Sequence, residues 1–171
     1  MVIEGENIMY RNVVCHSYEI HYTDFEKALD DFNEKLVQAG LTINGPLFYA
    51  LHNAPLEEIM DIDIYIPVEQ QYVDPATNLL FQSYFYIENM LMTRVKEDFN
   101  VNTEKAYEEI FRYAIDVNLQ IASPMYHIIR GDEELQWVDL KIKVFSEDDE
   151  DDSLSEREEG FLEKYTRRLG E

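Results

Sequence analysis

Hydrophobic residues recur along the first half of the chain with two different periods. Residues 12–22 are rich in β-branched and aromatic types, and residues 61–68 alternate apolar with polar side chains, so both stretches are predicted to be strands. A helix is predicted over 24–39, because apolar residues follow helical spacing there and Gly40 can adopt the left-handed conformation that ends a helix. With a shorter apolar strand at 47–52, the first half is predicted to run strand, helix, strand, strand.

The start of this helix is marked by Thr23 and Glu26. A threonine followed three residues later by a glutamate is typical of a capping box, in which each side chain accepts a hydrogen bond from the backbone N–H of the other residue. The helix is therefore expected to begin immediately after Thr23.

The second half repeats the same order of elements at a spacing of about 78 residues. A β-rich run at 81–95 precedes a predicted helix over 103–117, which Asn102 would cap and Asn118 would end. An asparagine is a suitable counterpart of Gly40 at this position, because its short polar side chain tolerates the left-handed conformation.

The last strand of each half gives the clearest match between them. Residues 137–144 alternate as 61–68 do, at an offset of 76, and this alignment places Asp139 on Asp63. An ordered set of matches is difficult to explain by chance, so we predict one duplicated domain. It is expected to cover 5–145, with halves of about 5–70 and 80–145 related through Pro46 and Pro124.

The C-terminal part of the chain has a different composition. Six consecutive acidic residues lie within 146–153, and their mutual repulsion predicts a solvated linker. Beyond it, 154–170 is predicted to form an amphipathic helix, which would pack on the core, on a partner, or on a second copy to give a homo-oligomer. Its apolar residues are Phe161, Leu162, Tyr165 and Leu169.

Composition and charge narrow the classes of function. The 171 residues carry 36 acidic against 14 basic side chains, a formal net charge of -22, which disfavours binding to nucleic acids or anionic membranes. A single cysteine, Cys15, and the lack of a signal peptide or a long apolar run predict a cytoplasmic protein. The histidines show no metal-ligand spacing, so we expect no metal or cofactor. They are His16, His21, His52 and His127.

Two segments of the first half resemble a known family. Residues 45–52 (GPLFYALH) and 61–68 (DIDIYIPV) are similar to the GyrI-like small-molecule-binding domain, the effector-binding module of some bacterial AraC- and MerR-type transcription activators. The resemblance implies an α+β fold in which two strand-helix-strand-strand repeats form one antiparallel sheet, with both helices on one face and a ligand cleft where the halves meet. The family often has a carboxylate just after the second proline, but 124–129 has none. A second departure from the family is that the repeat and the C-terminal part take up the whole chain, so we expect a stand-alone form without a DNA-binding region.

Alternation along the strands supplies the candidate ligand-binding residues. If Ile62 and Ile64 face the helices, the acidic and aromatic residues between them face the other side of the sheet, where they could line a cleft. An alternative is that this face is open to water, with Lys141 beside Asp139 as a favourable cross-strand charge pair. Trp137 fits the second interpretation least well, since its ring suits a ligand or a partner protein, although it could also simply be packed in the fold. The candidates are Asp63, Tyr65, Tyr126, Trp137 and Asp139.

Two classes of function follow. The first is a non-catalytic protein that binds a small hydrophobic, cationic or aromatic ligand between the two repeats, because ring faces and negative charge both attract cations. Some stand-alone relatives of the family are described as hydrolases that use a glutamate and a tyrosine, but no such glutamate is visible near Tyr126, so the sequence favours binding over catalysis. The second class is a cytoplasmic adaptor, chaperone-like or immunity-like protein that binds a basic partner polypeptide.

Overall fold

The computed structural model describes residues 1–54 and 57–146 and confirms the α+β class. The predicted helix at 154–170 and all but the first residue of the predicted acidic linker lie outside the described residues. No helix in the described ranges has the length and hydropathy needed to span a bilayer. The elements are β1 (Ile3–His21), η1 (Tyr22–Asp24), α1 (Phe25–Gln38), β2 (Phe48–Leu51), β3 (Ile59–Pro67), η2 (Pro75–Thr77), β4 (Leu80–Val95), α2 (Phe99–Asp116), β5 (Leu119–Ile121), β6 (Met125–Gly131) and β7 (Gln136–Ser146).

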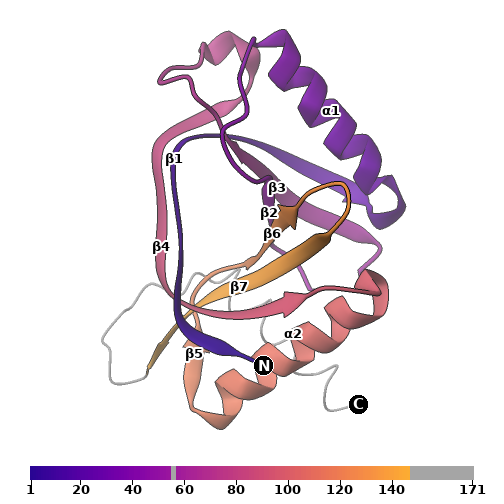
Figure 1. Ribbon diagram of the computed structural model, residues 1–171, viewed down its shortest axis with the longest axis vertical. Helices are drawn as coiled ribbons and strands as arrows, with labels where there is room; N and C mark the ends of the chain where they lie inside the picture. The colour runs from indigo at the N-terminus through magenta and orange to yellow at the C-terminus, as the bar shows by residue number, and fades with distance from the viewer. Residues whose placement is uncertain (55–56, 147–171) are drawn as a thin grey trace.

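The strands form one antiparallel sheet of seven strands in the order β4-β1-β3-β2-β6-β7-β5. An additional pairing between β4 and β7 joins the sheet to itself, so that six of the strands close a ring. Within the described part of the chain, β5 pairs only with the end of β7. Figure 1 shows β1 and β4 running together along one side as a long curved pair, which we call the β1–β4 arm.

The pairing registers repeat at the predicted offsets. Val13 pairs with Pro67, and Met90, 77 positions after Val13, pairs with Lys143, 76 positions after Pro67. Tyr49 pairs with His127, its counterpart at an offset of 78. Pairing between equivalent residues of antiparallel strands places an approximate twofold axis between β2 and β6. The ladder registers of the two halves therefore repeat at offsets close to those read from the sequence.

Both helices contribute to one hydrophobic core, on one face of the sheet. Ile62, Ile64 and Ile66 of β3 are buried there, as predicted from the alternation, together with side chains of α1, α2 and β7. Burying a side chain of this size stabilises the fold by roughly 1.5–3 kcal/mol, so this layer provides much of the stability. The helix residues in this core are Ala28, Phe32, Leu36, Ala106, Tyr107, Ile110, Phe111 and Ala114.

β1 begins nine residues before the predicted start at 12, whereas β4 matches the predicted run at 81–95 to within one residue, and each strand takes part in two ladders. The first part of β1 pairs with β4 and its last part pairs with β3, while the last part of β4 pairs with β7. Asn12 and Asn89, which are equivalent at an offset of 77, have φ angles of 55° and 58° where these partners change. A left-handed residue inside a strand bends it, so the β1–β4 arm can lie over the sheet face that the helices do not cover.

The helix ends were predicted better than the helix starts. Gly40 and Asn118 are left-handed, with φ angles of 67° and 58°, and end the helices as expected. The capping box at Thr23 is wrong: Thr23 lies in η1, and its Oγ1 is 2.7 Å from His21 Nδ1. Cap placement at Asn102 is also wrong, because α2 begins at Phe99.

Candidate functional site

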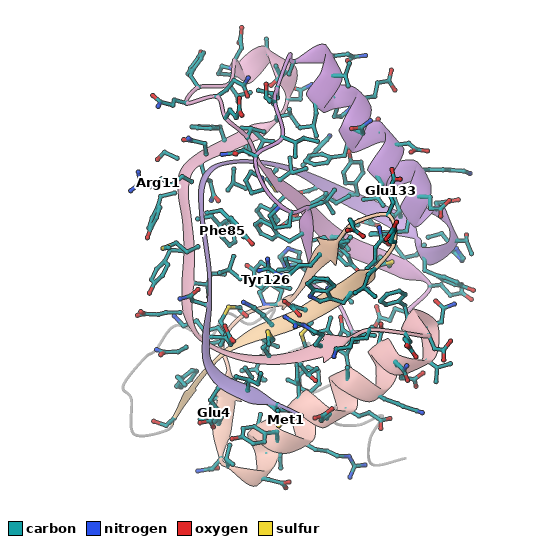
Figure 2. The ribbon with its side chains drawn as sticks, in the orientation of Figure 1. Met1, Glu4, Arg11, Phe85, Tyr126 and Glu133 are labelled. Atoms are coloured by element: carbon teal, nitrogen blue, oxygen red, sulfur yellow. The ribbon has the colours of Figure 1, made fainter. Side chains whose placement is uncertain are left out.

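A second group of buried side chains lies on the sheet face opposite the helices, beneath the β1–β4 arm. Its rings form what we call the aromatic cluster. Phe48 stacks on Tyr65 with ring centroids 4.9 Å apart and planes 5° apart, and Phe85 contacts Phe48 edge-on at 5.2 Å. Figure 2 shows Phe85 pointing from the arm toward the central strands, close to Tyr126, whereas Arg11 points outward. The cluster consists of Tyr10, Phe48, Tyr65, Phe85 and Tyr126.

These rings come from both halves of the chain. Tyr10, Phe48 and Tyr65 lie on β1, β2 and β3, while Phe85 and Tyr126 lie on β4 and β6. The structure brings Tyr65 and Tyr126, two of the predicted site residues, into this cluster. Sequence analysis missed Tyr10, Phe48 and Phe85, because which face of the sheet they occupy depends on the bend in the arm and on the register of β2.

Asp63 lies on the same sheet face at one end of the cluster. The Ser17 hydroxyl donates to Asp63 Oδ1 at 2.5 Å, and His52 Nε2 is 2.6 Å from Asp63 Oδ2. Burial favours the neutral acid, but the hydrogen bonds from His52 and Ser17 outweigh it and lower the pKa of Asp63. Next to it, burial and the nearby Asp63 charge raise the pKa of the Cys15 thiol to about 12. Cys15 is therefore protonated at neutral pH and a poor nucleophile.

Asp139 occupies the equivalent position at the other end of the cluster. Arg94 donates from Nε to Asp139 Oδ1 at 2.7 Å and from Nη2 to Oδ2 at 3.2 Å, and Arg130 Nε donates to Oδ2 at 3.0 Å. The hydrogen bond to Asp139 raises the pKa of Arg94 further. Only 3% of the Asp139 side chain is exposed, so the prediction of a water-facing acidic residue at this position is wrong. A buried carboxylate needs such partners, since burying an unpaired charge is costly.

The remaining candidate, Trp137, lies beside this ion pair. The guanidinium carbon of Arg94 is 5.3 Å from the centre of the indole ring, a cation–π contact. The indole Nε1 is buried and has no hydrogen-bond partner among the described residues. Lys141, which the sequence placed on an open face, is also buried, and its Nζ donates to the Asn7 carbonyl at 2.7 Å. The alternative of a polar face exposed to water is therefore wrong here: the arm covers it.

The partners of the two carboxylates lie at matching positions in the two halves, but they are different types of residue. Ser17 and Arg94 are 77 positions apart on β1 and β4, and His52 and Arg130 are 78 positions apart. Each half therefore supplies one carboxylate and two partners from matching positions. Sequence analysis matched Asp63 with Asp139 but did not identify these partners, because they lie on other strands or just beyond them.

A hollow open to solvent adjoins the aromatic cluster at Tyr126. Its volume is about 330 Å³, and it includes Glu88, the type of residue that sequence analysis did not find near Tyr126. Glu88 accepts a hydrogen bond from the Tyr86 hydroxyl at 2.8 Å. The lining residues are Tyr86, Ile87, Glu88, Ala122, Ser123, Pro124, Tyr126 and Lys143.

A second hollow, of about 490 Å³, lies between the end of β4 and α2. Its lining includes the basic side chains of Arg94, Lys96 and Lys105 and the acidic side chains of Glu97 and Glu109. Within residues 1–54 and 57–146, no group of three or more histidine, cysteine, aspartate or glutamate side chains is placed to hold a metal ion.

Comparisons with known proteins agree with this architecture. A family model described as "Domain of unknown function (DUF5085)" matches residues 9–146. The chain is similar in structure to a crystal structure of the EcmrR C-terminal domain, with a TM-score of 0.66 and 14% identity, over 83% of this chain and 98% of that one. It is also similar to EcmrR in a cryo-EM structure of its complex with DNA, with a TM-score of 0.69 and 14% identity, over 85% of this chain.

The chain spans 57% of the EcmrR chain in that complex. No curated protein matches it. At 14% identity the likeness establishes a shared fold, and it confirms the resemblance to GyrI-like effector-binding domains in that sense.

Proposed function

The chain belongs to the DUF5085 family, and from the aromatic cluster between its two halves we propose that it binds a flat, hydrophobic small molecule without converting it. The position of the cluster is the observation that carries this proposal. GyrI-like domains, which the sequence resembles, are expected to hold their ligands where the two repeats meet, and five aromatic rings gather at that place here.

The geometry of the rings suits a planar guest. Phe48 and Tyr65 are nearly parallel, and Phe85 presents its edge to both at 5.1–5.2 Å. A ligand ring that enters this cluster can replace one of the protein's ring–ring contacts with a ring–ligand contact of similar energy. Each such contact contributes about 0.5–1.5 kcal/mol in addition to the burial of apolar area. The ring faces also attract cations, and Asp63 provides a carboxylate at one end of the cluster. A cationic aromatic compound therefore fits the cluster, with its positive charge at the end near Asp63.

Entry of a ligand requires a rearrangement of the cluster. Phe48 is fully buried, and Phe85 and Tyr126 are almost so. Tyr126 borders both the cluster and the hollow of about 330 Å³, so it lies between this hollow and the fully buried Phe48. A ligand entering from this hollow would displace the Tyr126 side chain and stack against Phe48, with the β1–β4 arm above it.

The proposal is tested by thermal shift and dye fluorescence with a panel of flat aromatic compounds that includes cationic, neutral and carboxylate-bearing members. Binding at 100 times the dissociation constant should stabilise the protein by about 2.7 kcal/mol, a rise of a few degrees in Tm. The variants Tyr65→Leu and Tyr126→Leu should lose most of this shift. Tyr72→Leu is the matched control, because Tyr72 is 71% exposed and lies outside the cluster. The proposal fails if no compound in the panel raises Tm, or if the control loses the shift equally.

The second predicted class, binding of a partner polypeptide, stays a prediction. The segment expected to dock, 154–170, lies outside the described residues. The same panel separates the two classes: compounds that bind a variant with an intact cluster and fail to bind Tyr126→Leu indicate a small-molecule site, whatever else the chain binds.

A further inference from the structure

The two ends of the aromatic cluster differ in charge although they occupy equivalent positions. Around Asp63 the partners are Ser17 and His52, so this group carries no excess positive charge whether the histidine is protonated or neutral. Around Asp139 two guanidinium groups share one carboxylate. The second group therefore carries one excess positive charge.

This excess charge faces solvent. The Asp139 side chain is 3% exposed, whereas Arg94 is 42% and Arg130 is 35% exposed. A guanidinium has five N–H donors, and Arg94 uses its Nε and Nη2 groups on Asp139. The two arginines therefore cover the Asp139 carboxylate, while part of each guanidinium remains exposed to solvent.

A further observation favours an anion at this end. The Trp137 indole N–H is a buried donor without a partner among the described residues, and its ring lies 5.3 Å from the Arg94 guanidinium. Buried donors are normally satisfied, so an orphan beside two arginines indicates a missing acceptor.

The charged end is continuous with the aromatic cluster. Arg130 Nη2 donates to the Tyr10 hydroxyl at 3.4 Å, and Tyr10 stacks on Phe48 with centroids 5.5 Å apart. Ile128, which is buried in the same layer, pairs directly with Asp139 in the β6–β7 ladder. A ligand ring among the aromatic side chains could therefore extend an acidic substituent to Arg94 and Arg130.

We propose that Arg94 and Arg130 recognise a carboxylate, and that the ligand of this protein is an aromatic carboxylic acid whose ring occupies the aromatic cluster. The inference rests on the proposed function, since it assigns the ligand's charged group. Any basic group on the same ligand would lie at the opposite end, near Asp63. Arginine is suited to this role because its planar donors match the two oxygens of a carboxylate.

The first test uses two dyes that differ in this one group: rhodamine 110, which has a free carboxylate, and rhodamine 123, its methyl ester. Fluorescence anisotropy should show at least tenfold tighter binding of rhodamine 110, because a charge-assisted pair contributes about a factor of ten or more. Arg130→Gln should reduce this preference to less than threefold. Arg11→Gln is the matched control, as Arg11 is exposed and points away from the cluster (Figure 2), and it should keep the preference.

A second variant guards against simple misfolding. Arg94→Gln alone leaves the buried Asp139 with one partner fewer, so it is combined with Asp139→Asn, which removes the charge that needed that partner. This double variant should retain a cooperative melt and also lose the preference. Equal binding of both dyes by the unmodified protein overturns the carboxylate assignment and leaves the proposed aromatic site intact.

The second test does not depend on the dyes. Trp137 is the single tryptophan, so its indole N–H gives one resonance in an NMR spectrum of ¹⁵N-labelled protein. Titration with sodium benzoate should shift this resonance saturably, in the unmodified protein and in Arg11→Gln but not in Arg130→Gln. Sodium chloride at equal ionic strength should not reproduce the shift. A linear response, or the same response to chloride, overturns the site, and the absence of both dye binding and a benzoate response overturns the proposed function with it.

Discussion

His127, which pairs with its counterpart Tyr49 across the approximate twofold axis, is buried in an apolar layer. Its Nε2 lies 2.6 Å from the Tyr107 hydroxyl, and its ring stacks on Tyr49 at 4.3 Å. Burial lowers the pKa of His127 to about 3. The sequence did not distinguish His127 from the other three histidines, because nothing in its neighbours along the chain indicates that β2 and α2 cover it.

His127 should make the fold sensitive to acid. An unfolded histidine has a pKa of about 6.5, so between pH 6.5 and 3 the unfolded chain binds a proton that the folded chain does not, and the free energy of unfolding falls as the pH drops below 6.5. At pH 5 this loss is about 2 kcal/mol. Urea unfolding at pH 7.5 and pH 5 should show that His127→Gln loses about 2 kcal/mol less than the unmodified protein. Carboxylates contribute equally to both proteins, so an identical loss would contradict the assignment.

Single residues also show where sequence analysis of the site reaches its limit. Asp63 and Asp139 could be matched from the repeat alone, because the offset between the last strands is visible in the alternation. The partners that give these carboxylates opposite surroundings, such as His52 and Arg130, required the register between neighbouring strands. That register depends on contacts distant in the sequence, which periodicity does not encode.

At the scale of elements, the bent strands decide whether the aromatic cluster is covered. β1 and β4 each begin in one ladder and end in another, and a left-handed asparagine lies near the change of partner in each. Helix ends could be predicted because Gly40 and Asn118 act locally. The bends could not, since an asparagine in a β-rich run also fits an ordinary loop or turn.

The bend in β4 predicts a specific order among substitutions at Asn89. Asn89 is exposed and has a φ of 58°, a conformation that costs about 1–2 kcal/mol for a residue with a Cβ atom and little for glycine. Asn89→Ala should lower the free energy of unfolding by about 1 kcal/mol, while Asn89→Gly should leave it nearly unchanged. Ser83→Ala, at an exposed position of β4 without positive φ, serves as the control for loss of a polar side chain. Chemical denaturation measures all three, and equal stability of the Ala and Gly variants would argue against a strained bend.

For the whole molecule, the closed ring of six strands makes each half dependent on the other. β1 pairs with β4, and β2 pairs with β6, so both seams of the ring join one half to the other. The helices contribute to one shared core instead of two separate ones. The order of strands and helices in each half could be predicted from the sequence, but the closure of the ring could not, because it requires the β1–β4 arm to bend back over the sheet.

This interdependence predicts how the chain behaves when it is divided between its halves. Fragments 1–78 and 79–171, cut in the loop after η2, each keep a complete strand-helix-strand-strand unit but lose both seams and half of the shared core. Each fragment alone should lack a cooperative thermal transition or pair with a second copy of itself, since the halves are related by an approximate twofold axis. An equimolar mixture should form a one-to-one complex with the circular dichroism of the intact chain, as shown by light scattering after size exclusion. A fragment that melts cooperatively as a monomer would show that the ring is two independent domains, and the aromatic cluster would then be an interface between domains instead of the interior of one.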